Sequence, residues 1–201
     1  MPFYLAPLPE WGKPILDFIA PRILVEVNDI TCFPSRSRHN RKRLVQLAQN
    51  GFLKRFELTT AEKPVIAYSL GDQGIRETKI IVPTLFSLDK AQELIIANKF
   101  ILFHNITEFR LWVSRGLLIG EITLESKRFS LWCPRKPETR LKSLRKEIPL
   151  GINGLIVLAP NLKHVYPLAT QLSDIRLPIY FVVDSALKRF MRLEDGILVP
   201  V

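Results

Sequence analysis

The segment from Ser37 to Asn50 reads SRHNRKRLVQLAQN, with its cations in the first half and its apolar residues in the second. Leu44, Leu47 and Ala48 recur at the spacing of one helix face, which predicts an amphipathic helix. Asn50-Gly51 predicts the end of that helix, because both residues readily adopt the left-handed conformation that stops a helix. The apolar half must therefore pack on other elements while the basic half stays at the surface.

The elements around this helix can also be read from the sequence. Lys13-Pro14 predicts the start of a helix, since proline is well tolerated in a first turn, and Pro21 ends or bends it. Val27, Ile30 and Phe33 predict a short second helix with Asn28 as its N-cap. The runs FLKRFELT and VIAYSL, separated by TAEKP, predict a hairpin with a charged tip. The predicted order is helix, short helix, helix, hairpin.

The net charge of +10 is concentrated in this region rather than spread along the chain. The stretch from Ser35, the expected cap of the basic helix, to Arg55 contains no acidic residue. It holds seven cations: Arg36, Arg38, Arg41, Lys42, Arg43, Lys54 and Arg55. A basic cluster of this kind is typical of a surface that binds a polyanion, with nucleic acid as the first expectation.

The positions of these residues predict individual roles at a DNA duplex. A recognition helix enters the major groove by its N-terminal half, where its dipole and cations meet phosphates. Asn40 and Arg41 are suited to base edges, because Asn can pair with adenine and Arg with guanine. His39 could contact a base or a phosphate. Lys54 and Arg55 open the hairpin and are expected on the DNA backbone. Val45 is expected to widen the apolar stripe.

The segment LVQLAQNGFLKRFEL…AYSLGDQG resembles the recognition helix, turn and wing of bacterial winged helix-turn-helix proteins. The residues that carry the resemblance are Leu44, Leu47, Gly51, Phe52, Leu53, Tyr68, Leu70 and Gly74. The resemblance implies a DNA-binding domain over residues 1–80. The alternative for the basic helix is a solvated face without a partner.

The remaining residues, 81–201, are expected to form a separate α/β domain, with a boundary near 75–85. IRETKIIVPTLFS is expected to be a connector and Leu88–Lys99 a helix. ILFHN, EFRLWVS, LLIGEITLES, RFSLWCP, GLIVLAP and IYFVVD predict strands, and Leu141–Lys146 and HVYPLATQL predict short helices. The expected class is therefore α+β, with an α/β domain after the winged helix. This layout resembles the replication-relaxation family of plasmids and mobile elements, whose second domain is related to the restriction-endonuclease fold.

A metal-dependent nuclease is the alternative in the enzyme class. Glu125-Ser126-Lys127 has the Glu-x-Lys spacing of a restriction-endonuclease-like Mg²⁺ site, and Glu121 lies on the same face of the predicted strand. The acidic residue that such a site needs on the preceding strand is missing. We therefore expect a degenerate, non-catalytic version of the fold, with no catalytic residues, metal or cofactor.

A second basic cluster, RKPETRLKSLRKE at 135–147, has two readings that the sequence leaves open: a further contact to DNA or an acidic partner, or a solvated helix face. Cys32 and Cys133 have no metal-binding spacing and are expected to be reduced and packed. The N-terminus lacks the pattern of a signal peptide and no apolar run is long enough to span a membrane. We expect a cytoplasmic, homodimeric protein that binds double-stranded DNA in transcription regulation or in plasmid replication or transfer. The other alternative is a basic module that binds an acidic protein.

Overall fold

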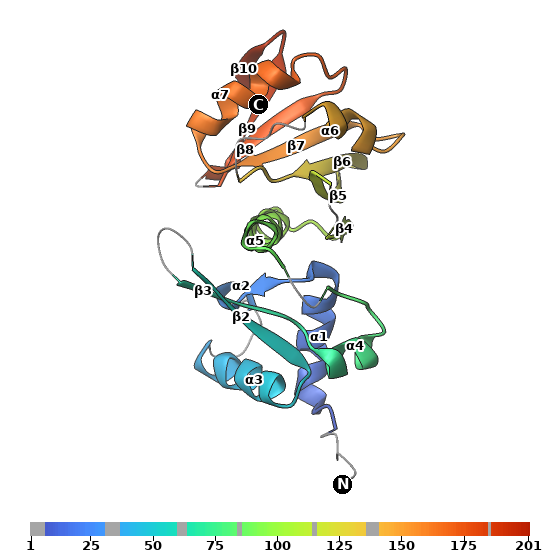
Figure 1. The fold of residues 1–201 in the computed structure, drawn as a ribbon, viewed down its shortest axis with the longest axis vertical. Helices are drawn as coiled ribbons and strands as arrows, with labels where there is room; N and C mark the ends of the chain where they lie inside the picture. The colour runs from blue at the N-terminus through green and yellow to red at the C-terminus, as the bar shows by residue number, and fades with distance from the viewer. Residues whose placement is uncertain are drawn as a thin grey trace. The chain divides into compact units, whose positions relative to one another are not determined.

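A computed structural model describes residues 7–30, 37–59, 64–83, 86–113, 116–135, 141–184 and 186–201. Helices and strands both contribute, so the chain has an α+β fold (Figure 1). It divides into two compact units, Met1–Ile95 and Ile96–Val201. The division falls inside helix α5 (Leu88–Phe103), downstream of the boundary expected near 75–85.

The first unit is built on a three-stranded antiparallel sheet with strand order β1-β3-β2. Helices α1, α2, α3 and α4 pack against this sheet. The elements run η1 (Glu10–Gly12), α1 (Lys13–Ile19), η2 (Ala20–Arg22), β1 (Val25–Glu26), α2 (Val27–Ile30), α3 (Ser37–Gln49), β2 (Leu53–Thr59), β3 (Pro64–Leu70) and α4 (Asp72–Thr78). The predicted helix at Pro14, the basic helix and the hairpin are confirmed.

The end of α3 forms two hydrogen bonds that turn the chain into β2. The Gly51 N–H donates to the Ala48 carbonyl at 3.1 Å, and the Phe52 N–H donates to the Leu47 carbonyl at 2.9 Å. This pair of bonds is a Schellman motif, which needs a left-handed residue at its centre. Gly51 supplies it with φ of +75°, which confirms the predicted helix stop.

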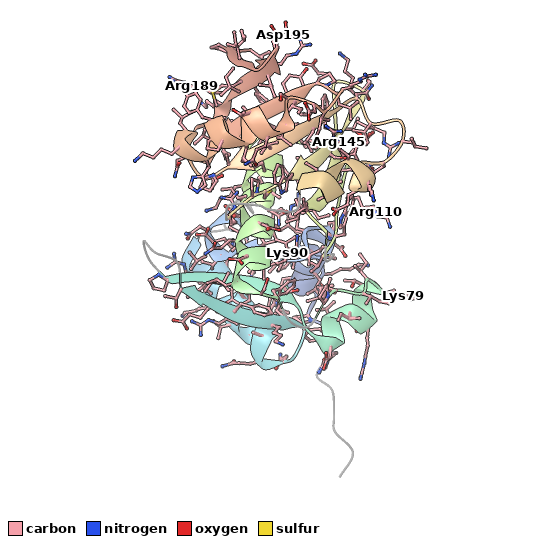
Figure 2. All side chains as sticks on the ribbon, turned by 45° about the horizontal axis from the view of Figure 1, so that its top comes forward. Lys79, Lys90, Arg110, Arg145, Arg189 and Asp195 are labelled. Atoms are coloured by element: carbon pink, nitrogen blue, oxygen red, sulfur yellow. The ribbon has the colours of Figure 1, made fainter. Side chains whose placement is uncertain are left out.

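Two local predictions for the first unit were wrong, and one strand was not predicted. Asn28 does not cap the second helix: it lies within α2, and its Nδ2 donates to Glu26 Oε1 at 2.9 Å. Strand β1 was not foreseen, because a two-residue strand shows no alternation to detect. The expected connector begins with helix α4, which ends where Lys79, marked in Figure 2, adopts a left-handed conformation.

The second unit contains a seven-stranded mixed sheet with strand order β10-β9-β8-β7-β6-β5-β4. Its elements are β4 (Phe109–Leu111), β5 (Leu118–Leu124), β6 (Lys127–Trp132), α6 (Leu141–Glu147), β7 (Gly154–Ala159), α7 (Leu162–Leu172), β8 (Ile179–Val183), β9 (Ala186–Glu194) and β10 (Ile197–Pro200). Strands β6, β7 and β8 are parallel and the other neighbours are antiparallel.

Both faces of this sheet are covered within the unit. Val157 and Phe181 share a buried cluster with Val165 and Leu168 of α7. On the opposite face, Phe100 of α5 makes an edge contact with Phe190 of β9 at 5.9 Å between ring centroids. Continuous burial of all six residues of β7 follows from this two-sided cover.

The prediction of a strand at ILFHN is wrong, because Ile101 and its neighbours continue helix α5 to Phe103. Ile101 and Phe100 are fully buried, and a short apolar run does not distinguish a buried helix from a buried strand. The final hairpin, β9–β10, was not predicted. Its two-residue turn is Asp195-Gly196, with φ of +48° and +79°, a dipeptide that strongly favours this turn.

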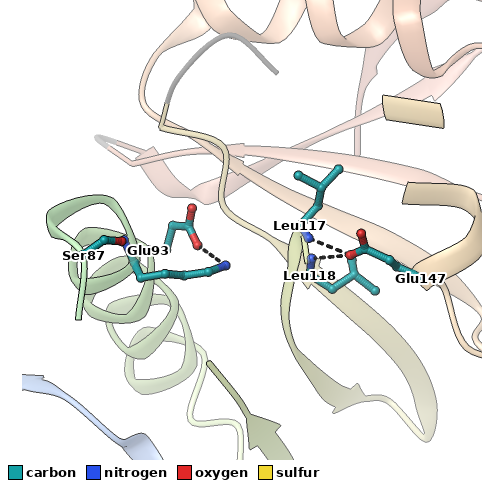
Figure 3. Close-up of polar contacts among 6 residues, drawn as sticks. Ser87, Glu93, Leu117, Leu118 and Glu147 are labelled. Atoms are coloured by element: carbon teal, nitrogen blue, oxygen red, sulfur yellow. Dashed lines mark hydrogen bonds and ion pairs between the residues drawn. The ribbon is translucent and has the colours of Figure 1, made fainter. Parts of the chain in front are cut away.

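Figure 3 shows side-chain contacts at the end of α6 and within the first turns of α5. In the second unit, Glu147 Oε2 at the end of α6 accepts from the Leu117 N–H at 2.6 Å and the Leu118 N–H at 3.3 Å. In the first unit, Lys90 Nζ donates to Glu93 Oε2 at 2.7 Å. The Glu147 contact joins α6 to the start of β5.

Candidate nucleic-acid interface

Helix α3 separates a basic surface from an apolar core, as its sequence predicted. Leu44 and Leu47 are fully buried in the first unit. His39, Arg41 and Lys42 are exposed in the N-terminal half of the helix. The unpaired N–H groups at a helix N-terminus and the cations beside them both favour anions. This half of α3 is therefore suited to contact a polyanion.

Asn40 is not available as a base-reading residue, which corrects its predicted role. Its exposed fraction is 3%, so its amide faces the protein rather than a partner. The sequence spacing predicts this burial, because Asn40 lies four residues before Leu44 and seven before Leu47, on the same helix face.

Arg43 and Val45 also differ from their expected environments. The Arg43 guanidinium carbon lies 5.3 Å from the centre of the Trp11 ring, a cation–π contact that draws the side chain toward η1. This contact was missed because Trp11 is distant in the sequence. Val45, expected in the apolar stripe, is 45% exposed and adds an apolar group to the surface that carries Arg41 and Lys42.

The hairpin presents its two cations on opposite faces of the sheet, because successive strand residues alternate. Lys54 Nζ lies 5.4 Å from the Phe56 ring centre. Arg55 is paired in register with Tyr68 of β3 and forms an exposed ion pair with Glu57 at 3.7 Å, which contributes little to stability. Burial raises the pKa of the Tyr68 hydroxyl, and the nearby Arg55 opposes that shift.

Some of the predicted site lies outside the described residues. This applies to Arg36, to the expected cap Ser35, to the side chain of Arg38 and to the hairpin tip at 60–63. Cys32, expected to be a packed cysteine, also lies outside them. The described part of the interface consists of His39, Arg41, Lys42, Arg43, Lys54 and Arg55.

The residues of the nuclease alternative do not form the expected strand motif. Glu125 and Ser126 have φ of +48° and +63° and form the turn between β5 and β6, where Leu124 pairs with Lys127. Glu121 Oε2 accepts from Arg128 Nη2 at 2.8 Å. In the part of the chain that the structure describes, no three His, Cys, Asp or Glu residues are grouped so that they could hold a metal ion.

The second basic cluster does not form one solvated face, because Arg135 is buried. Its guanidinium forms an ion pair with Asp184 and donates from Nη2 to the Leu158 carbonyl at 2.9 Å. Arg145 and Lys146 on α6 are exposed, and Arg145 lies 3.4 Å from the Asp174 carboxylate. Lys136 and Arg140 and the side chain of Lys142 lie outside the described part. Among the described residues of this cluster, Arg145 and Lys146 are the cations at the surface.

Comparison with known proteins assigns no family to the chain. No family model matches it, and no curated protein matches it. A solved structure that matches is the crystal structure of protein VC1899 from Vibrio cholerae, with 14% sequence identity and a TM-score of 0.32. The match covers 87% of this chain and 47% of that protein, so the chain spans about half the length of VC1899. A TM-score this low carries no argument about fold or function. Among the described residues, no helix has the length and apolar character needed to cross a membrane.

Proposed function

We propose that the chain binds double-stranded DNA through a winged helix-turn-helix in its first unit. The observation that carries the proposal is the exposure of Arg41 and Lys42 on the N-terminal half of α3, whose C-terminal half is anchored by Leu44 and Leu47. The element order α1–β1–α2–α3–β2–β3 and the strand order β1-β3-β2 support a winged helix. In this arrangement α3 enters the major groove and the hairpin lies on the backbone.

The proposed contacts divide by chemistry. Arg41 is placed to read a guanine edge through paired hydrogen bonds. His39, Lys42 and Arg55 contact phosphates, which fix register without reading sequence. Arg43 contributes less than these, because Trp11 already engages its guanidinium. The process served by this binding is transcription regulation or plasmid replication or transfer.

We propose a non-catalytic role for the second unit, as a degenerate relative of the restriction-endonuclease fold that mediates dimerisation. A mixed sheet with helices on both faces supports the fold. The location of Glu125 in a hairpin turn, rather than along a strand with Lys127, supports the absence of catalysis.

The experiment is a DNA-binding titration of the full chain at several salt concentrations, using a duplex selected from a random pool. Arg41→Ala combined with Lys42→Ala should weaken binding by about 100-fold and reduce the slope of log affinity against log salt by about 1, since the lost phosphate contact of Lys42 removes about 0.9. Arg76→Ala is the control, because it removes an exposed cation of α4 in the same unit. Unchanged affinity and slope in the double variant would show that α3 is not the DNA contact.

A further inference from the structure

The first unit contains a cleft between α3 and the hairpin that DNA reading alone does not require. Its volume is about 450 Å³, and it is lined by α2, α3, β1 and both hairpin strands. Clefts of roughly 300–1,000 Å³ are the size that takes small molecules. The size therefore suits a ligand with more atoms than a single phosphate.

Two guanidinium groups line this cleft from different elements. Arg41 comes from α3 and Arg55 from β2. Two cations that approach from separate walls can hold one carboxylate or phosphate by charge-assisted hydrogen bonds. Tyr68 of β3 also lines the cleft, and its hydroxyl can donate a hydrogen bond to an anion.

Apolar side chains form much of the rest of the lining. Val45 reaches the cleft from α3, and Ile66 reaches it from β3, on the same sheet face as Arg55 and Tyr68. Val45 is 45% exposed, so its methyl groups are available to contact an apolar group. An occupant with an apolar body would bury this surface.

One acidic residue, Glu26, also lines the cleft. Its Oε1 accepts from Asn28 Nδ2 at 2.9 Å, and the residue is 5% exposed. Arg55 also forms an exposed ion pair with Glu57 at 3.7 Å, a weak contact that a bound anion would replace. Glu57 does not line the cleft, so the lining itself carries two cations and one carboxylate, which favours an anion.

We propose that this cleft binds a small organic anion, a carboxylate or phosphate carried on an apolar body. Its charged group pairs with Arg41 and Arg55, and its body packs on Val45 and Ile66. The consequence for DNA rests on the proposed function: a ligand that holds Arg41 competes with a base or phosphate for the same guanidinium. By reciprocity, the ligand and DNA weaken each other's binding by the same factor.

The test is a titration of the ¹⁵N-labelled full chain, without DNA, with benzoate, phenyl phosphate and indole-3-acetate. Benzyl alcohol is the neutral analogue. The anions should shift the amide resonances of Val45, Ile66 and Tyr68 with dissociation constants in the millimolar range or tighter. Arg41→Ala and Arg55→Ala should each weaken binding about tenfold.

Lys54→Ala is the matched control, because it removes a cation from the same strand on the opposite sheet face and should leave the affinity for the anions unchanged. If no anion shifts these resonances at about 20 mM, or if benzyl alcohol binds as tightly as benzoate, the cleft is not an anion site. The DNA titration is separate. Anion binding without any DNA binding would reject the proposed function alone, and DNA binding without anion binding would reject this inference alone.

Discussion

At the residue scale, the ion pair between Arg135 and Asp184 joins the ends of β6 and β8 in the second unit. The Arg135 side chain is 9% exposed, and its Nη2 also holds the Leu158 carbonyl of β7. One guanidinium thus spans three parallel strands. A buried pair of this kind adds little net stability over an apolar pair, but removing one partner leaves an uncompensated buried charge.

The pH dependence of this pair has an unusual sign. Burial raises the pKa of the Asp184 carboxyl above its ordinary 3.8, and Arg135 only partly opposes the shift. Between the ordinary and the raised pKa, the folded state binds the proton more tightly than the unfolded chain does. This contribution to the free energy of unfolding therefore increases as pH falls through that window.

We predict that urea unfolding of the wild type and of Asp184→Asn will show this sign. The stability advantage of the wild type over the variant should grow as pH is lowered from neutral toward 4, because only the wild type gains from protonation of this group. An advantage that instead shrinks with acid would show that the ion pair outweighs burial.

Single residues also show where the sequence was informative and where it was not. Exposure of Arg41 and Lys42 followed from the helical pattern. Burial of Asn40 follows from the same pattern, but Asn40 was predicted to read bases because an Asn side chain can pair with adenine. The Trp11–Arg43 contact could not be predicted, since it depends on how η1 meets α3.

At the element scale, the junction of α3, β2 and α4 depends on two glycines for different reasons. Gly51 has φ of +75°, and a Cβ added there would meet nothing closer than Gln73 Nε2 at 3.5 Å. Gly74 has ordinary backbone angles, but its Cβ would lie 2.2 Å from the Phe52 carbonyl oxygen. The first glycine is required by conformation and the second by close approach.

We predict that these glycines respond differently to substitution. Gly51→Ala should lower the free energy of unfolding by about 1 to 2 kcal/mol, the cost of a left-handed alanine, and Gly51→Asn by less. Gly74→Ala should cost more, because backbone must move to relieve the overlap. Chemical denaturation of the three variants measures this order. A smaller loss in Gly74→Ala than in Gly51→Ala would contradict it.

Elements were predictable where a period repeated several times. The thirteen residues of α3 and the paired runs of the β2–β3 hairpin met this condition. The β9–β10 hairpin was overlooked although Asp195-Gly196 signals it. The end of α5 could not be predicted, because its apolar residues face a sheet that forms from later parts of the chain.

At the whole-molecule scale, the second unit offers an edge for self-association. Strand β10 ends the described sheet, and Ile197, Val199 and Val201 are 67%, 37% and 74% exposed. An edge strand with apolar side chains is a template for pairing with another strand. A second copy of β10 in antiparallel orientation would satisfy both edges symmetrically.

We predict that the protein is a dimer in solution and that Ile197→Lys with Val199→Lys makes it monomeric, because the added charges must be desolvated at the edge. Size-exclusion chromatography with light scattering measures the mass. Tyr166→Lys is the control, since it removes an exposed apolar side chain from α7, away from the edge. A monomeric wild type, or a dimer that survives the edge substitutions, would reject this interface.

The sequence by itself determined the α+β class, the amphipathic division of α3 and its stop, and the concentration of charge at one helix and hairpin. These depend on near neighbours in the chain, whose spacing determines which side chains share a face. The tertiary structure decided the burial of Arg135, the cation–π contact of Arg43 with Trp11, and the cleft that Arg41 and Arg55 both line. Each of these depends on contacts between segments distant in the sequence, which no local period records.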